Sequence, residues 1–245
     1  MILLISGEGP TDMGSCMEMD KEASGANFKP GPMALLIDQL VNPIWNYSPL
    51  GDESFVFLSE RFLDTEAKKI RSMKLPGLKS AKGTAIFGKQ ARALAKLAKD
   101  KKNKDNCPVG AVLFHDSDGT RSDPNTLWKD KCESIENGFA AEEFDLGVAM
   151  VPKPKSEAWL LCAVQKTPYN NCARFEKLSG NDSSPKNAKG RLATELKAKG
   201  KSQNEVCDMI MNNQIQAQQI DMPSYNYFRD RMEKVARLMT GIPKK

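Results

Sequence analysis

The chain has 245 residues, of which 40% are hydrophobic, and a formal net charge of +5. This length supports one domain with a substantial core, and the apolar content excludes wholesale disorder. No apolar run approaches the roughly 18 residues that a membrane-spanning helix needs, so we expect no membrane partner. The six cysteines include no pair with the two-residue spacing of redox or zinc motifs. We therefore expect reduced thiols in a cytoplasmic protein.

The only histidine is His115. A single histidine excludes metal sites built from several histidines, including His-rich zinc sites. A serine or cysteine nucleophile activated by histidine would have to use His115, which stands next to Asp116 at a predicted strand end. We therefore do not expect that type of catalysis.

In chain order, short apolar runs alternate with segments of helical periodicity: strand 1–6, helix 33–41 after Pro32, strand 54–58, helix 86–97, strand 109–114, helix 124–139 capped by Asp123, strand 146–151, and a helix capped by Ser156 that runs to Ala163. Residues 167–184 are polar and loop-like, and helical periodicity returns at 186–199, 204–211 and 225–239. The alternation predicts an α/β fold with a mainly parallel sheet flanked by helices. We expect a core at 1–165 and a mainly helical C-terminal extension at 166–245, packed on the core as a further layer.

Two of the predicted strands run into acidic turns. The first strand is followed by Gly7-Glu8-Gly9-Pro10-Thr11-Asp12, and the third by His115-Asp116-Ser117-Asp118-Gly119. Because ligands of open parallel sheets bind beyond the carboxyl ends of the strands, Glu8, Asp116 and Asp118 are expected to meet there. Alternate residues of an extended segment point the same way, so Asp116 and Asp118 can face one ion.

Carboxylates held together repel one another unless a cation lies between them, and an all-oxygen site favours Mg²⁺. Each residue also has a simpler interpretation. Glu8 is equally typical of a solvated turn, Asp12 of a residue that caps the next segment, and the Asp116–Asp118 pair of an Asp-rich turn.

A third acidic segment follows the fourth predicted strand. Glu157 lies in the first turn of a predicted helix, where a carboxylate interacts favourably with the helix dipole. It can equally be another acid of the site, with the helix N-terminus receiving a phosphate. In that case Lys153 and Lys155 neutralise phosphate charge.

Lys and Arg greatly outnumber Asp and Glu between Arg61 and Lys104. Such an excess is typical of a solvated helix face. It also suits phosphate binding, which dominates affinity for nucleic acids. On the second interpretation, reversing the charge of several of Lys82, Lys89, Lys96 and Lys99 weakens polynucleotide binding.

Together, Glu-Gly-Pro-Thr-Asp at Glu8–Asp12 and Asp116-x-Asp118 after a later strand resemble the TOPRIM domain, and most closely its branch in OLD-family nucleases. In that branch the second acid is usually Glu, where this chain has Asp12. The segments 151–161, 185–189 and 222–228 are similar to short, stand-alone bacterial TOPRIM-like proteins, which often accompany ATPases in presumed phage-defence loci. The motifs cover the first 160 residues well and the remainder loosely.

The resemblance implies a metal-dependent nuclease that hydrolyses DNA or RNA with Mg²⁺ or Mn²⁺, and an OLD-like or related ATPase as a partner. It implies metal ligands at Glu8, Asp12, Asp116, Asp118 and Glu157. It also implies catalytic roles for Glu8, Asp116, Asp118, Glu157 and Lys155.

Two alternatives remain open from the sequence. One is a nucleic-acid-binding or regulatory subunit of an ATPase-containing complex, whose acids are only structural. The other is a different acidic-site enzyme that acts on small phosphoesters, such as a phosphatase. A metal titration separates the first from a nuclease, and the choice of substrate separates the second.

Overall fold

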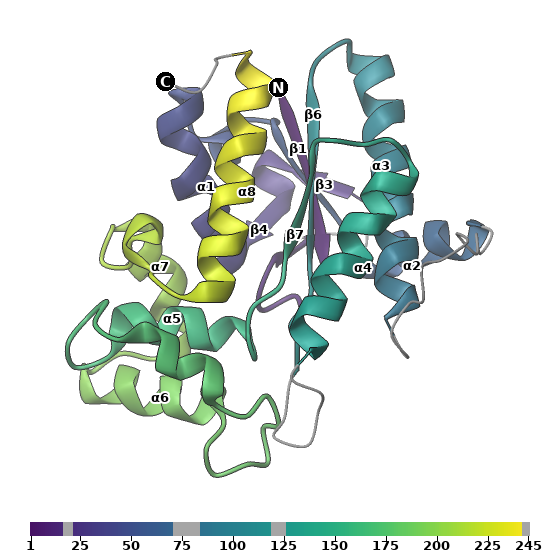
Figure 1. Ribbon diagram of the computed structural model, residues 1–245. Helices are drawn as coiled ribbons and strands as arrows, with labels where there is room; N and C mark the ends of the chain where they lie inside the picture. Colours follow the sequence, from purple (N-terminus) through teal and green to yellow (C-terminus); the bar gives the residue numbers. More distant parts are fainter. Residues whose placement is uncertain (17–21, 71–83, 119–125, 242–245) are drawn as a thin grey trace.

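The computed structural model describes residues 1–16, 22–70, 84–118 and 126–241. Its centre is a five-stranded sheet with the strand order β3-β5-β1-β6-β7 (Figure 1). The neighbours β5 (Phe55–Leu58), β1 (Ile2–Gly7), β6 (Val109–Phe114) and β7 (Gly147–Met150) pair in parallel. The edge strand β3 (Glu22–Ser24) is antiparallel to β5. The prediction of an α/β fold with a mainly parallel sheet is confirmed.

Helices cover both faces of the sheet (Figure 1): α1 (Pro32–Trp45) and α8 (Pro223–Thr240) lie on one side, and α2 (Glu60–Lys69), α3 (Ala85–Asp105) and α4 (Leu127–Ala141) lie on the other. Alternate side chains of β1 enter the two resulting cores, with Leu3 and Ile5 in one and Leu4 in the other. Burial on both faces explains why this strand is a continuous apolar run rather than an alternating one.

The remaining helices gather near the carboxyl ends of the strands (Figure 1): α5 (Ser156–Val164), α6 (Ala188–Ala198) and α7 (Val206–Met211). The strands β2 (Gly14–Cys16) and β4 (Phe28–Pro30) form a separate antiparallel ribbon. Short 3₁₀ turns complete the fold at Gly25–Asn27, Pro49–Gly51, Cys172–Lys177, Gln203–Glu205 and Ala217–Gln219.

Some local predictions need correction. Ser156 is the first residue of α5 rather than its cap, which is Lys155. Helix α2 lies inside the basic span and was not predicted, although Ser59 caps it by accepting a hydrogen bond from the Phe62 amide. The three-residue strands were also missed, because so short a run carries no periodicity. The expected cap Asp123 lies outside the described residues.

The pairing of β1 with β6 sets the position of the two acidic turns. Gly7, the last residue of β1, is opposite Phe114, the last residue of β6. A Cβ atom at position 7 would lie 2.6 Å from the Cβ of Phe114, so the close approach requires glycine. Glu8 and His115 therefore leave the sheet side by side.

Cys162 and Cys172 form a disulfide, with their Cα atoms 5.0 Å apart. The expectation that all six cysteines are reduced thiols is wrong for this pair. The chain turns back after α5, so that a residue ten positions later packs against the helix, and sequence spacing gave no sign of this turn. Among the described residues, no helix is both long and apolar enough to cross a membrane.

Candidate active site

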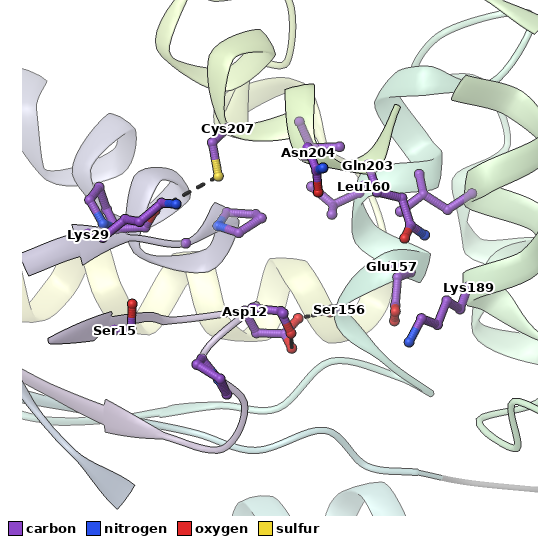
Figure 2. Close-up of a pocket in the computed structure, with 17 residues that line it drawn as sticks. Asp12, Ser15, Lys29, Ser156, Glu157, Leu160, Lys189, Gln203, Asn204 and Cys207 are labelled. Atoms are coloured by element: carbon purple, nitrogen blue, oxygen red, sulfur yellow. Dashed lines mark hydrogen bonds between the residues drawn. The ribbon is translucent and has the colours of Figure 1, made fainter. Parts of the chain in front are cut away.

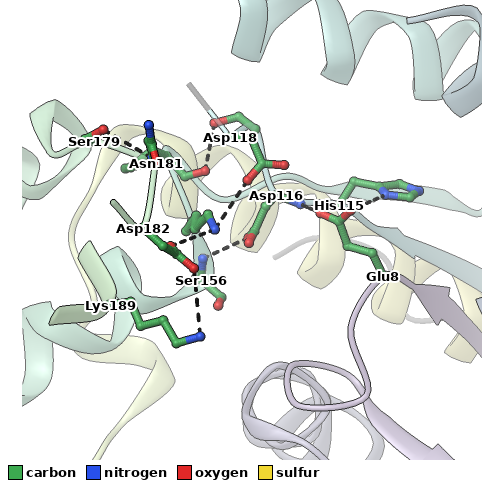
Figure 3. A network of polar contacts seen from close by, with 12 residues as sticks. Glu8, His115, Asp116, Asp118, Ser156, Ser179, Asn181, Asp182 and Lys189 are labelled. Carbon is green, nitrogen blue, oxygen red and sulfur yellow. Dashed lines mark hydrogen bonds and ion pairs between the residues drawn. The ribbon is translucent and has the colours of Figure 1, made fainter. Parts of the chain in front are cut away.

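Glu8 and Asp116, from the two acidic turns, are in direct contact at the carboxyl ends of β1 and β6. One carboxylate oxygen of Glu8, Oε1, accepts a hydrogen bond from the backbone amide of Asp116 at 2.5 Å. Figure 3 shows the Glu8 side chain beside Asp116 and His115. The parallel sheet thus brings together residues that are 108 positions apart in the chain.

The first residue of α5 joins two further acids to this pair. The backbone amide of Ser156 donates a hydrogen bond to Asp116 Oδ1 at 2.9 Å, and its hydroxyl donates to Asp12 Oδ1. Glu157 follows in the first turn of the same helix. We call Glu8, Asp12, Asp116 and Glu157 the carboxylate cluster.

The cluster places negative charges together in a partly buried position. Burial raises the pKa of Asp116 to about 9, and the charges of Asp12, Glu8 and Glu157 add to the shift. Burial also raises the pKa values of Asp12 and Glu157 above their ordinary range. Each of these residues is therefore harder to ionise than a free carboxylic acid, and a nearby cation would reverse that effect.

Glu8 is the exception in the cluster, because its pKa is lowered. Burial opposes its ionisation, but contact with the His115 ring, the charge of that ring and the Asp116 amide together outweigh burial. Glu8 also keeps 35% of its side-chain surface exposed. It is thus an ionised carboxylate open to solvent, as a proton acceptor needs to be.

A chain of polar contacts orients His115 behind Glu8. The amide nitrogen of Gln90 donates to Asp64 at 2.7 Å, so its oxygen faces Nε2 of His115 at 2.8 Å. Because that oxygen only accepts, Nε2 carries a proton. Nδ1 lies 3.5 Å from Glu8 Oε2 and has no hydrogen-bond partner among the described residues. Gln90 therefore fixes the His115 ring beside Glu8, at the margin of the carboxylate cluster.

Asp118 does not join the cluster. The expectation that it faces the same ion as Asp116 assumed an extended backbone, but its φ is 51°, in the left-handed region. Its carboxylate lies 3.6 Å from Lys155, which also contacts Asp182 at 3.0 Å. Lys189 lies 3.9 Å from Asp182, and Figure 3 shows both of these residues near Asp118. We call these four residues, Asp118, Lys155, Asp182 and Lys189, the ion-pair network.

The donor set of the cluster fits a hard divalent cation in its chemistry. All its ligating atoms are carboxylate oxygens, and Glu157 Oε2 is buried with no hydrogen-bond partner among the described residues. As they stand, however, no three His, Cys, Asp or Glu side chains of the described residues converge closely enough to hold a metal ion. The residues that fit best are Asp12, Asp116 and Glu157, with Glu8 beside them.

The basic span is only partly near the cluster. Helix α3 leads into β6, so its C-terminal lysines lie at the amino ends of the strands, whereas Asp116 lies at their carboxyl ends. Lys96 lies 3.9 Å from the Glu142 carboxylate and Lys99 donates to the Glu142 carbonyl, whereas Lys82 lies outside the described residues. These contacts agree with the simpler interpretation of a solvated helix face for the C-terminal half of α3.

One cation that contacts the cluster among the described residues is Lys131, which the sequence did not point to. Lys131, in the first turns of α4, donates to the Asp116 carbonyl at 2.8 Å and lies 4.8 Å from the centre of the Phe87 ring. Its charge also favours ionisation of Glu8. The only sign of Lys131 in the sequence is its place early in the helix after β6, because that helix begins at the carboxyl ends of the strands, where the cluster lies.

Comparison of the chain with protein-family models, with curated proteins and with solved structures gave no match. The resemblance to TOPRIM domains therefore rests on the motifs in the sequence and remains a prediction.

Proposed function

We propose that the protein is a metal-dependent nuclease that hydrolyses phosphodiester bonds of DNA or RNA. The observation that carries the proposal is the carboxylate cluster, in which acids lie close together in a partly buried position at the carboxyl ends of parallel strands. Burying like charges costs stability, so a structural role alone does not account for it. The resemblance of the motifs to TOPRIM nucleases supports the same activity.

In this proposal Asp12, Asp116 and Glu157 would hold Mg²⁺ or Mn²⁺. When bound, such an ion supplies positive charge to the phosphate and favours attack by water. Water attacks phosphorus, the bond from phosphorus to the leaving oxygen breaks, and the leaving oxygen takes a proton from solvent. Glu8 accepts the proton that the attacking water loses, and the Asp116 amide holds its carboxylate in position by a hydrogen bond.

Lys131 and Lys155 would neutralise the phosphates that flank the scissile bond. Lys131 lies directly against the Asp116 backbone, and Lys155 precedes the helix that carries Glu157. The resemblance further suggests an ATPase partner and a place in phage defence, so cleavage is best assayed both for the protein alone and with an ATPase encoded beside it.

The test is cleavage of labelled single-stranded and duplex DNA and RNA in Mg²⁺ and in Mn²⁺. We expect cleavage that stops in EDTA and falls at least about a hundredfold in Asp116→Asn and in Glu8→Gln, because each removes a charge that the reaction uses. Asp105→Asn, at the far end of α3, is the matched control and should cleave at the wild-type rate. Cleavage by Asp116→Asn at the wild-type rate would refute the proposal.

A second candidate is a non-catalytic nucleic-acid-binding or regulatory subunit. It is favoured by one observation, that no three acids of the described residues stand close enough to hold a metal ion as they are. Binding of Mg²⁺ separates the two candidates. Calorimetric titration of the wild type should detect one or more Mg²⁺ ions if the cluster is a metal site, and Asp116→Asn should weaken that binding. Nucleic-acid binding without any binding of Mg²⁺ would favour the subunit.

A further inference from the structure

A cavity of about 380 Å³ lies directly beside the carboxylate cluster (Figure 2). It is bounded by the turn after β1, the β2–β4 ribbon, the start of α1, and helices α5, α6 and α7. Asp12, Ser156 and Glu157 belong both to its lining and to the site described above. The volume falls within the roughly 300–1,000 Å³ that is typical of small-molecule pockets.

The lining combines apolar and polar groups in separate places. Leu160, Leu192 and Val206 supply a buried apolar wall. The exposed amide side chains of Gln203 and Asn204 lie at the rim, on the turn that leads into α7. A flat group with apolar faces and hydrogen-bonding edges, such as a nucleobase, is complementary to this combination.

Exposed lysines flank the acids of the cavity. Figure 2 shows Lys29 of the ribbon and Lys189 of α6 on either side of Asp12 and Glu157. A polynucleotide strand carries one phosphate per nucleotide, so a strand that crosses the cluster would place successive phosphates toward the two lysines. Two lysines with the acids between them are more complementary to a chain of phosphates than to a neutral ligand.

We propose that the cavity holds one unpaired nucleotide, adjacent to the phosphate that is cleaved. The inference rests on the proposed function and deepens it by naming the substrate class. A base within a duplex is stacked and paired, so it cannot enter a side cavity unless it is flipped out. The substrate is accordingly single-stranded DNA or RNA, or an unpaired end.

The first test measures binding rather than cleavage. Fluorescence anisotropy with the full chain, in Ca²⁺ and separately in EDTA, compares a labelled single-stranded oligonucleotide with its duplex. We expect the single strand to bind at least about tenfold more tightly, because only it offers an unpaired base. Equal affinity for the two forms would overturn the inference.

Variants at the rim locate the binding. Asn204→Trp fills the mouth of the cavity, and its control Asn212→Trp changes an exposed residue of the same type at the other end of α7, away from the lining. Lys189→Glu and its control Lys197→Glu lie on one helix, but only Lys189 lines the cavity. The two cavity variants should weaken single-strand binding roughly fivefold or more, while the controls stay within about twofold. Equal losses in a variant and its control would refute the assignment.

Small ligands test whether the cavity contacts the base. AMP and dAMP, titrated by calorimetry, should bind more tightly than ribose 5-phosphate, and Asn204→Trp should remove the difference. If ribose 5-phosphate binds as tightly as the nucleotides, the cavity is a phosphate site and the inference fails.

The outcomes distinguish this inference from the proposed function. A protein that passes these binding tests but never cleaves in Mg²⁺ or Mn²⁺ overturns the proposed function and leaves the nucleotide site standing. One that cleaves, yet binds duplex and single strand equally, overturns the inference alone.

Discussion

The carboxylate cluster and the ion-pair network both lie at the carboxyl ends of the strands. The network pairs charges of opposite sign, whereas the cluster gathers charges of the same sign. In the network, lysines alternate with aspartates, and Asp118 and Asp182 keep 51% and 52% of their side-chain surface exposed. In the cluster, carboxylates lie near one another in a partly buried position, and none forms an ion pair with a lysine among the described residues. The charge of Lys155 only partly offsets the effect of burial, which raises the pKa values of Asp12 and Glu157. Lys155 of the network and Glu157 of the cluster are only two positions apart in the chain, at the start of α5.

The difference indicates which of the two regions is the functional site. Exposed ion pairs of opposite sign are common on protein surfaces and change stability by about 0–1 kcal/mol. A buried group of like charges is unfavourable in the absence of a ligand, and residues with strongly shifted pKa values gather at functional sites. The cluster, rather than the network, is therefore where binding of a cation is expected.

The largest effect that tests this contrast is the pH dependence of stability. Between pH 3.8 and about 9, the unfolded chain has lost the Asp116 proton while the folded protein keeps it. Stability therefore falls as pH rises through this window and the full penalty is present above about pH 9. Asp116→Asn, which keeps the acceptor for the Ser156 amide, removes the penalty and should be more stable by on the order of 1–3 kcal/mol at pH 8.

Urea unfolding in EDTA from pH 4 to pH 9 measures this effect. The free energies of unfolding of the wild type and of Asp116→Asn should be close at pH 4 and should diverge steadily as the pH rises. A difference that is constant across the range would mean that the ionisation of Asp116 is not shifted. Asp182→Asn serves as the control, because its carboxylate belongs to the ion-pair network.

An effect of comparable size is stabilisation by divalent cations. A ligand that binds only the folded state raises its stability by about 2.7 kcal/mol when present at a hundred times its dissociation constant. The melting temperature of the wild type should rise by several degrees in Mg²⁺ at constant ionic strength. Glu157→Gln should reduce the rise, because it removes the carboxylate with the unpartnered oxygen. An equal rise in both proteins would place any bound ion elsewhere.

A third test compares a lysine at the carboxyl ends of the strands with a lysine at their amino ends. Lys131→Gln should weaken polynucleotide binding and lower the dependence of log affinity on log salt by about 0.7–0.9, the value for one phosphate contact. Lys102→Gln, in the last turn of α3 at the opposite edge, should change neither quantity. If Lys102→Gln has the larger effect, the basic helix rather than the site edge contacts the nucleic acid.

The sequence predicted the sheet well because the buried strands are apolar runs with polar ends. The bounds of Val109–Phe114 were predicted correctly. The parallel arrangement alone does not choose the neighbours of β1, which pairs with β5 as well as with β6. The pairing with β6 is what brings Glu8 to Asp116. Strands of three residues, by contrast, carry no period that a sequence can reveal.

The details of the site were harder to predict, because they depend on single backbone angles and on packing between distant segments. The positive φ of Asp118 turns its side chain toward Lys155, and Gly180 allows a loop to pack against the Asp118 backbone. Lys131 reaches the site through the start of α4, which follows a segment with no apolar pattern. The orientation of His115 depends on Gln90, whose role becomes visible only in three dimensions.

The smallest expected effect, and the one that compares the two regions directly, comes from double-mutant cycles. Lys155→Met and Asp182→Asn break an ion pair with 19% and 52% of the two side chains exposed, so their coupling should be attractive and only about 0.2–1 kcal/mol. Asp116→Asn and Glu157→Gln relieve the same repulsion, so each should stabilise the metal-free protein, and the double variant should gain less than the sum of the two. The two couplings therefore have opposite signs, measured by urea unfolding at pH 8 in EDTA. An attractive coupling between Asp116 and Glu157 would mean that a shared proton or another cation already balances their charges, and the case for an added metal ion would fall with it.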